Sequence, residues 1–547
     1  MTASSSMTGG TALVRALTEN GVDTVFGLPG IQLDGLFNAL YDARNSLRVI
    51  NARHEQGTAY MAFGYAQSTG KVGAYAVVPG PGLLNTFAAL STAYGCNARV
   101  LALTGQIPSN TIGRGLGMLH EIPDQLGQME RLTKWSHRIN HPSEVPAVMD
   151  QAFRELWSGR PRPVGIEMPI DQLHLEAPVS PITPTVPPEP PEPDPDKIAE
   201  AARMLGEASN PMIFVGGGAY EAAEEIRALA EMLQAPVVSY MNGKGVLDDR
   251  HPLSLHHPAG NRFWGDADVV ISIGCRLQHE RMTWGTDDQL TIIHIDIDPT
   301  ELTRVGKPDV GIVADAAGAV RALLGKISAH NSARPSRTEE MEALKAEFQA
   351  QFEAKIGPQM EWLAAIRTAL PEDGFLVDEF TQVAYASRVG FPTYGPRTLV
   401  SPGYQGTLGY GYATALGVQV AHPDKQVLSI NGDGGFMYTM PELATAVHHG
   451  INVVAVVFAD GAYGNVMRMQ KELYDNRVIG SEFTNPDFVK LAESCGALGL
   501  RATTPTELKK KIEEGFASGR PTLIEVPVGE FPEPWPVIRP GPSRPKR

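Results

Sequence analysis

Hydrophobic and polar positions follow two patterns that alternate along the chain. Uninterrupted apolar runs are typical of strands buried on both faces, and they include VGAYAVV (72–78), DVVISIG (268–274) and INVVAVVFADG (451–461). Between such runs, apolar residues recur at helical spacing, as in TALVRALTENG (11–21), which predicts a helix that ends at Gly21. Because predicted strands and helices alternate throughout, the sequence indicates the α/β class, with parallel sheets covered by helices.

Two polar breaks divide this pattern. Residues 177–196 contain nine prolines, which predicts an extended linker on the surface. A second polar stretch spans 328–340, and the chain becomes proline-rich again from Glu530. We expect the first six or so residues to be a disordered extension. The predicted domains are three α/β units with parallel sheets, at 8–176, 197–327 and 355–530.

Composition narrows the class of protein. With 547 residues the chain exceeds one hydrophobic core, and 43% apolar and 20% charged residues are ordinary for a soluble enzyme. No apolar run approaches about 18 residues and no signal peptide is recognisable, so we expect no membrane span and a cytoplasmic location. The net charge of −15 argues against a nucleic-acid partner. Cys96, Cys275 and Cys495 form no CxxC pair and are predicted to be small core residues.

A glycine-rich turn ends one strand of the last predicted domain. The residues are Asn431, Gly432, Asp433, Gly434 and Gly435, so the aspartate stands at the carboxyl end of a parallel strand, where α/β folds bind ligands. The glycines allow the backbone to approach a phosphate group closely.

The helix after this turn is expected to start with a capping box formed by Thr439 and Glu442 and to end at Gly450. Asp460 ends the next predicted strand. Two oxygen ligands at neighbouring strand ends suit Mg²⁺, which takes few protein ligands when phosphate oxygens complete its shell.

The spacing of these motifs resembles the signature of thiamine-diphosphate-dependent enzymes, in which GDG is followed after about two dozen residues by Asn-Asn. The resemblance implies that Asp433, Asp460 and the backbone carbonyl of Ala462 bind magnesium, with Tyr463 beside them at the cofactor. Asp460 replaces the usual second asparagine and is an equally suitable oxygen ligand. The alternative is an ordinary Asp-Gly turn and an unrelated aspartate in a loop.

The first predicted domain carries a second part of the resemblance, RHEQG at 53–57. It resembles the motif of the cofactor-activating glutamate, and this implies that Glu55 hydrogen-bonds N1′ of the aminopyrimidine. That contact would favour the imino tautomer, which removes the C2 proton of the thiazolium and leaves a ylide. The alternative is a glutamate favoured at a helix N-terminus by the helix dipole.

Further segments extend the resemblance over about residues 8–530. GYQGTLG at 403–409 resembles the loop that holds thiamine in a bent conformation, with Leu408 as the prop and the Gly406 carbonyl as acceptor; the alternative is a glycine-rich loop with a core leucine. Pro29 and Asn85 lie in loops similar to those of the family's first domain, and Thr381 and Gln382 lie where the family contacts the diphosphate. HIDIDP at 294–299 and NPDFVKLAE at 485–493 resemble stretches of acetolactate synthases.

The expected substrate pocket departs from the pattern of true acetolactate synthases. His120 stands in place of a glutamine, Met469 in place of a tryptophan, and Asn465 where methionine is common. We expect His120, Asn465 and Gln32 near the reacting carbon, where a histidine can move protons near neutral pH. The alternative for His120 is a loop histidine that caps the neighbouring helix. Without the tryptophan we expect poor synthesis of acetolactate from two pyruvates.

The resemblance also raises the question of a flavin in the middle domain, since acetolactate synthases bind FAD there. Residues 215–218 and 274–276 fit loosely, but the Gly-Met-His-Gly stretch of flavin binders is absent and LHHPAGN at 255–261 is a shorter substitute. FAD is therefore not favoured, and the triple glycine is equally a tight turn.

These observations predict a lyase or carboligase that depends on thiamine diphosphate and Mg²⁺ and acts on a 2-oxo acid or related dicarbonyl. The alternatives are a simple 2-oxo acid decarboxylase, a lyase of 2-hydroxy-ketones or diones, and a non-catalytic protein that only holds thiamine diphosphate. A Rossmann oxidoreductase fails because no GxGxxG opens a helix with an acidic residue about twenty positions later. In this family the cofactor lies between two subunits, so we expect a homodimer or homotetramer with shared active sites.

Overall fold

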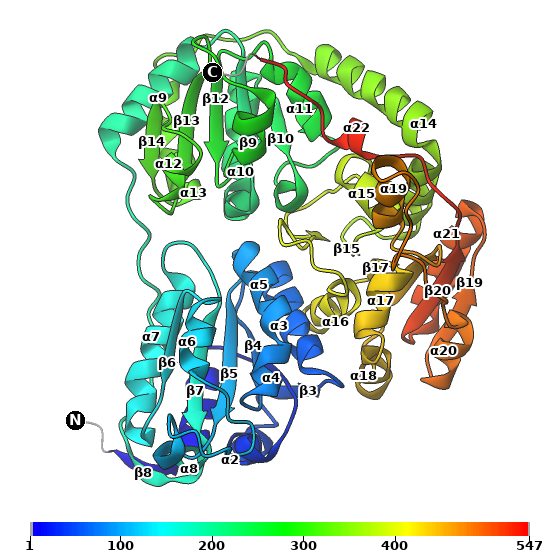
Figure 1. Ribbon diagram of the computed structural model, residues 1–547. Helices are drawn as coiled ribbons and strands as arrows, with labels where there is room; N and C mark the ends of the chain where they lie inside the picture. The colour runs from blue at the N-terminus through cyan, green and yellow to red at the C-terminus, as the bar shows by residue number, and fades with distance from the viewer. Residues whose placement is uncertain (1–3, 545–547) are drawn as a thin grey trace.

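The computed structural model describes residues 4–544, and in it three parallel sheets of six strands each form the framework (Figure 1). The predicted α/β class is confirmed. Each sheet and the helices that cover it are called a block, and the blocks are named first, middle and third in chain order. No helix within residues 4–544 is long and apolar enough to cross a membrane.

The first block has the strand order β3-β2-β4-β5-β7-β6. Its strands are β2 (Thr24–Gly27), β3 (Arg48–Asn51), β4 (Gly73–Val77), β5 (Val100–Gln106), β6 (Trp135–Arg138) and β7 (Val164–Pro169). Its helices are α1 (Gly9–Glu19), α2 (Asp34–Asp42), α3 (Glu55–Thr69), α4 (Pro81–Asn85), α5 (Phe87–Gly95), α6 (Gln125–Glu130), α7 (Val145–Trp157) and α8 (Ile170–His174).

The middle block has the order β11-β10-β9-β12-β13-β14. Its strands are β9 (Pro211–Val215), β10 (Val237–Ser239), β11 (Ser254–His256), β12 (Val269–Ile273), β13 (Thr291–Asp296) and β14 (Val310–Val313). Its helices are α9 (Pro195–Glu207), α10 (Ala223–Leu233), α11 (His257–Trp264), α12 (Glu301–Arg304) and α13 (Ala316–Ile327).

The third block has the order β16-β15-β17-β18-β20-β19. Its strands are β15 (Phe375–Asp378), β16 (Leu399–Val400), β17 (Val427–Gly432), β18 (Val454–Ala459), β19 (Leu498–Arg501) and β20 (Thr522–Pro527). Its helices are α14 (Thr338–Ala369), α15 (Gln382–Gly390), α16 (Gly411–Ala421), α17 (Asp433–Thr439), α18 (Glu442–His449), α19 (Gly464–Leu473), α20 (Phe488–Ser494), α21 (Pro505–Ser518) and α22 (Trp535–Ile538).

The expectation that the first six or so residues form a disordered extension is wrong for Ser5 and Ser6, because they belong to a small additional sheet. Strand β1 (Ser5–Thr8) pairs antiparallel with β8 (Glu176–Val179), so Ser5 and Ser6 are ordered by backbone hydrogen bonds. The start of the proline-rich run is therefore an edge strand, a position that tolerates proline. Residues 1–3 lie outside the described residues, and the predicted domain boundaries stay a prediction.

Two smaller expectations are also wrong. The predicted helix is α18, which begins at Glu442, but it has no capping box: Thr439 ends a preceding helix, α17, and its hydroxyl donates to the Gly409 carbonyl at 2.9 Å. Gly450 does end α18, in the left-handed conformation. Of the cysteines only Cys96 is buried, whereas Cys275 and Cys495 are half-buried.

Helices α3 and α16 hold the first and third blocks together (Figure 1). A Cβ atom at Gly64 would clash with the backbone carbonyl of Thr414, and one at Gly417 would clash with that of Met61. Glycine at both positions therefore allows the two helix backbones to touch.

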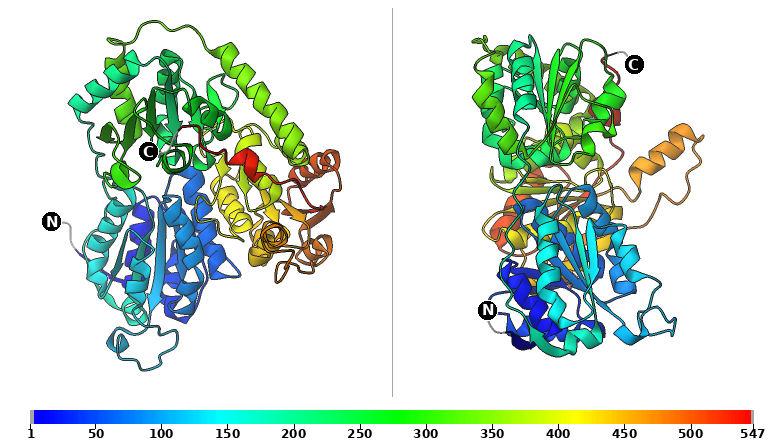
Figure 2. Two further views of the ribbon diagram at one scale, coloured as in Figure 1. Left: turned by 45° about the horizontal axis from the view of Figure 1, so that its top comes forward. Right: turned by 90° about the vertical axis from the view of Figure 1, so that its left-hand side faces the viewer.

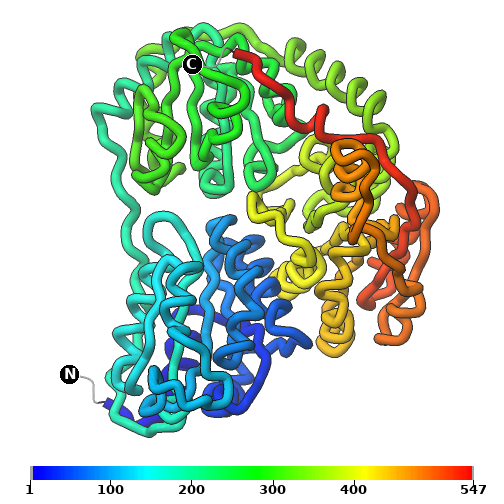
Figure 3. The backbone as a smooth tube through the Cα atoms, viewed as in Figure 1, coloured from blue at the N-terminus to red at the C-terminus, as the bar shows by residue number. Residues whose placement is uncertain are grey.

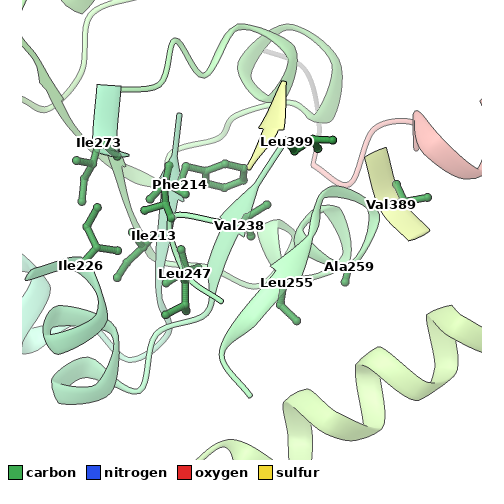
Figure 4. Close-up of a cluster of buried hydrophobic side chains, with 14 of the residues drawn as sticks. Ile213, Phe214, Ile226, Val238, Leu247, Leu255, Ala259, Ile273, Val389 and Leu399 are labelled. Atoms are coloured by element: carbon green, nitrogen blue, oxygen red, sulfur yellow. The ribbon is translucent and has the colours of Figure 1, made fainter. Parts of the chain in front are cut away.

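The middle and third blocks share one hydrophobic core and a C-terminal strap. Figure 4 shows Ile213 and Val238 of the middle block in one cluster with Val389 and Leu399 of the third. The strap, residues 528–544, runs from the third block back to the middle block (red in Figure 3), where Arg544 pairs with Asp287 at 2.6 Å.

Candidate functional site

A cavity of about 400 Å³ opens at the carboxyl ends of the strands in the third block. Most of the residues predicted to bind cofactor or metal line it: Thr381, Gln382, Gly406, Leu408, Gly432, Asp433, Gly434, Gly435, Asp460, Ala462 and Tyr463, together with Asn465. The rest of the lining is largely apolar and comes from Phe380, Tyr385, Tyr438, Phe458, Gly464, Val466, Val528 and Phe531.

Asp433 is the first residue of α17 and is only 2% exposed. Its Oδ1 accepts from the Gly434 backbone at 2.8 Å, and its Oδ2 accepts from the Gly461 backbone at 2.8 Å and from Asn485 Nδ2 at 2.6 Å. These donors fix the carboxylate at the end of β17, beside the end of β18. The N-terminus of α17 also lies at the cavity, and a helix N-terminus favours an anion.

Asp460 follows β18 and completes a set of hard oxygen donors. Loss of water contact at the cavity and the charge of the neighbouring Asp433 raise the pKa of Asp460 to about 6. Two carboxylates that repel each other, with the carbonyl-bearing Ala462 beside them, fit a bound Mg²⁺, which would offset the repulsion.

The loop before α16 faces this carboxylate pair across the cavity. Gly406 adopts the left-handed conformation (φ 63°), and Leu408 is half-buried against the cavity, so it is not the core leucine of the alternative interpretation. Gly409 closes the loop by donating its backbone N–H to the carboxylate of Glu379.

Glu55 is the first residue of α3 in the first block. Its Oε2 accepts from Asn85 Nδ2 at 3.0 Å, and its Oε1 faces Gly82, where a Cβ atom would lie 3.7 Å away. The start of α3 is held from the third block, because Glu442 accepts from the backbone N–H groups of Arg53 and His54 at 3.0–3.2 Å. Glu442 is fully buried and holds the backbone just before α3, so it is not part of a capping box on its own helix. The N-cap of α3 is His54, whose side chain accepts from the Gln56 backbone at 3.1 Å.

The remaining predicted residues lie in the first block as well. His120 Nδ1 lies 2.9 Å from Gln32 Oε1, and Gln32 Nε2 donates to the Leu119 carbonyl at 3.0 Å. The helix-capping alternative for His120 is wrong, because the side chain of Asp124 caps α6. Pro29 is exposed at the end of the β2 loop.

The structure therefore divides the predicted site into two halves. The residues that line the cavity all lie between 380 and 531, whereas Glu55, Asn85 and the His120–Gln32 pair belong to the first block. Large apolar side chains are exposed near both halves. They are Ile31, Leu116 and Leu119 in the first block and Val466, Met469 and Leu473 on α19, which projects from the molecule (orange, right view of Figure 2).

A separate cavity of about 290 Å³ adjoins the middle block and includes Gly217, Gly218 and Asp296. The Asp296 carboxylate is already engaged by Arg160 of the first block at 3.3 Å. A Cβ atom at Gly218 would lie 2.9 Å from Gly274, so close packing of two loops explains that glycine without a ligand.

Sequence profiles of three thiamine pyrophosphate enzyme domains match this chain: the N-terminal TPP binding domain at 7–128, the central domain at 198–323 and the C-terminal TPP binding domain at 381–526. A probable acetolactate synthase large subunit of Methanocaldococcus jannaschii is 34% identical, over 98% of this chain and 94% of its own. The chain belongs to the thiamine pyrophosphate enzymes of the acetolactate synthase type.

Other relatives in this family carry different names. An acetolactate synthase of Arthrospira platensis is 33% identical over 98% of this chain and 96% of its own. The probable 2-ketoarginine decarboxylase AruI of Pseudomonas aeruginosa is 33% identical over 95% of this chain and 94% of its own. The predicted family is thus confirmed.

Sequence analysis missed three acidic or amide side chains that organise the site. Glu379 is 2% exposed beneath Gly409 and Gly435, and its Oε2 has no hydrogen-bond partner within residues 4–544. Asn485 holds Asp433 and belongs to a segment noted only for its resemblance. The sequence signal that could have identified Glu379 is its place as a second acidic residue directly after an apolar strand. For Glu442, the local sequence pattern suggested a capping box with Thr439, which is the wrong partner.

Substitution of Asp433, a predicted metal ligand, tests the half of the site that lies in the third block. Asp433→Ala should remove the magnesium-dependent part of thiamine diphosphate binding, because Asp460 alone gives too few oxygen ligands. Isothermal calorimetry with and without Mg²⁺ measures this, with the exposed Asp424→Ala as control. Unchanged magnesium-dependent affinity in Asp433→Ala would remove Asp433 from the metal site.

Burial raises the pKa of Glu379 to about 8, and this predicts a pH-dependent stability. An unfolded glutamate has a pKa of about 4.3. The folded protein therefore binds an extra proton between these values, and its stability falls as the pH rises from about 4.3 to about 8. Glu379→Gln, which resembles the protonated acid, should lose less stability over this range, by up to a few kcal/mol. Thermal unfolding at pH 5 and pH 9 measures the difference, with the exposed Glu361→Gln as control; parallel pH profiles for wild type and Glu379→Gln would contradict the assignment.

Proposed function

We propose that this chain uses thiamine diphosphate and Mg²⁺ to break or form a carbon–carbon bond next to a carbonyl, with a 2-oxo acid or related dicarbonyl as substrate. The observation that carries the proposal is the pairing of two half-sites in one family member: a carboxylate held at the start of α3, and two carboxylates at the ends of β17 and β18. When bound, thiamine diphosphate supplies a carbon nucleophile that attacks the substrate carbonyl.

In this proposal the third block anchors the cofactor. Asp433, Asp460 and the Ala462 carbonyl would hold the metal, and the N–H groups at the start of α17 would meet the diphosphate. Thr381, whose hydroxyl already caps α15, and Gln382 would contact the diphosphate from the start of α15. Leu408 and the Gly406 carbonyl would support the pyrimidine end, with Tyr463 at the cavity wall.

Glu55 would hold a proton at N1′ of the aminopyrimidine. Its hydrogen bond from Asn85 fixes one carboxyl oxygen and leaves the other available. This role distinguishes an enzyme from a protein that merely stores the cofactor, because storage requires the metal ligands but no group that exchanges a proton with N1′.

His120, Gln32 and Asn465 would contact the substrate. The contact between His120 Nδ1 and Gln32 Oε1 defines which tautomer is favoured: Nδ1 carries the proton, and Nε2 is left as the acceptor. His120 would then take and return protons on the substrate side through Nε2.

The reaction after carbon–carbon cleavage has two candidates. Relatives named acetolactate synthase favour carboligation with a second carbonyl compound, whereas the relative named 2-ketoarginine decarboxylase favours simple decarboxylation. Met469, in place of the acceptor-selecting tryptophan, favours the second candidate over acetolactate synthesis from two pyruvates. Binding of FAD is not favoured in this proposal, since Arg160 already pairs with the Asp296 carboxylate in the middle-block cavity.

The same proposal includes a homodimer or homotetramer in which the first block of one subunit completes the cavity of another. The exposed apolar side chains near both half-sites support this, because exposed large apolar side chains are typical of a subunit interface. The three predicted domains, at 8–176, 197–327 and 355–530, belong to this arrangement.

Glu55→Gln tests the proposed activation. The variant should fold and keep most of its cofactor affinity, because glutamine is nearly isosteric and the metal ligands lie in the other half-site. It should exchange the C2 proton of bound thiamine diphosphate about 10²–10⁴-fold more slowly, since an amide cannot exchange a proton with N1′. Deuterium incorporation at C2, followed by NMR after acid quench, measures this rate.

Glu19→Gln, on the surface of α1, is the control for adding an amide elsewhere. Slow exchange in Glu55→Gln with retained cofactor binding would support the role of Glu55 and exclude one limited to the helix dipole. Exchange at the wild-type rate would show that Glu55 does not activate the cofactor.

A further inference from the structure

The amide of Asn465, on α19, is held in one orientation by two donors. Its Oδ1 accepts from the indole Nε1 of Trp535 at 2.9 Å and from the guanidinium of Arg468 at 2.7 Å. Neither an indole N–H nor a guanidinium can accept a hydrogen bond. The atom that faces them must therefore be the amide oxygen, and the reversed orientation would set N–H groups against N–H groups.

The opposite side of the same amide is free. Asn465 lines the cavity, and its Nδ2 has no hydrogen-bond partner within residues 4–544. Because the amide oxygen already accepts two hydrogen bonds, only the NH₂ group can still form hydrogen bonds. Asn465 thus offers donors only, and it suits a carbonyl or carboxylate oxygen rather than a hydroxyl or amine proton.

The C-terminal strap fixes the indole that sets this orientation. Trp535 packs against Tyr385 with ring centroids 4.6 Å apart and the ring planes tilted by 47°, and the Arg539 guanidinium covers it at 4.6 Å. Just before it, the Pro532 carbonyl accepts from the buried Gln359 at 2.7 Å. Phe531 of the strap lines the cavity itself. The strap is therefore a wall of the site as well as a tie between blocks.

We infer that Trp535 and Arg468 are positioning residues that make Asn465 a dedicated hydrogen-bond donor to an oxygen of the substrate. The inference rests on the proposed function and narrows it: the substrate presents an acceptor oxygen, such as that of a 2-oxo acid, at this point of the cavity. Arg468 is itself paired with Glu533 at 3.5 Å and with Glu472 at 3.9 Å, and these ion pairs hold the guanidinium that faces the amide.

Three substitutions separate this role from simple packing. Asn465→Ala removes the donor, whereas Asn465→Asp keeps both bonds to Trp535 and Arg468 but turns an anionic oxygen toward the substrate. Trp535→Phe keeps the aromatic contact with Tyr385 and removes only the N–H, which leaves Arg468 as the one remaining donor that holds the amide. Trp157→Phe, in the first block, is the matched control, since its indole N–H donates to no group within residues 4–544.

The hydrogen bond from the Trp535 indole to Asn465 is tested by NMR of protein labelled with ¹⁵N at the six tryptophan indoles. Trp535→Phe identifies the Trp535 signal by its loss. That signal should move upfield in Asn465→Ala, where the acceptor is gone, and downfield in Asn465→Asp, where the acceptor is charged. An unchanged signal in both variants would overturn the inference.

Kinetics of the holoenzyme, with the 2-oxo acid that wild type turns over fastest, test the substrate contact. Asn465→Ala should lower kcat/KM by about 10- to 100-fold, the range for losing a hydrogen bond to a charged group. Asn465→Asp should be lower still, with most of the loss in KM. Trp535→Phe should lose less, and Trp535→Phe combined with Asn465→Ala should be no worse than Asn465→Ala alone.

Additive losses in the double variant, or an Asn465→Asp variant as active as wild type, would overturn the inference. Failure of the proposed function has a different signature. Wild type itself would then turn over no 2-oxo acid, whereas the NMR result would be unaffected.

Discussion

The contact between α3 and α16 constrains where the two half-sites of a single chain can lie. Glycines at 64 and 417 let the two helix backbones touch, and this leaves little freedom to slide or rotate one block against the other. Glu442 adds a polar restraint from the third block, because it accepts from the backbone N–H groups of Arg53 and His54 just before α3. The position of α3, the helix that carries Glu55, is therefore fixed by the third block of the same chain. Glu55 nevertheless does not line the cavity in that block.

This constraint gives the chemistry a physical logic. A buried carboxylate destabilises the fold unless it has a hydrogen-bond partner or a counter-charge, and three of them lie at this site. Asp433 accepts from three donors, and the pKa of Asp460 is raised. Glu379 lies below the loop before α16 with one carboxyl oxygen unpaired. A bound cation would compensate the charge of the first two. The proposed second subunit would cover the exposed apolar side chains near both half-sites.

Much of this arrangement could be predicted from sequence because it depends on local rules. Parallel strands bring their carboxyl ends to one edge, so Asp433 and Asp460 could be placed together before the structure was known. Contacts between distant segments could not. Glu442 looks like half of a local capping box but binds backbone N–H groups almost 400 residues earlier in the chain. Trp535 meets Asn465 only because the strap folds back. Such contacts depend on how blocks pack, which neither periodicity nor spacing specifies.

Complementation between two inactive variants tests the shared site most directly. Glu55→Gln impairs the first-block half-site and Asp433→Ala the third-block half-site, so neither homodimer has an intact site. A mixed dimer has one intact site, built from the Glu55 of one subunit and the Asp433 of the other. After refolding of an equal mixture, activity should return to about one quarter of wild type, since about half of random dimers are mixed and each has one intact site of two. Activity no higher than that of the separate variants would contradict a site shared between subunits.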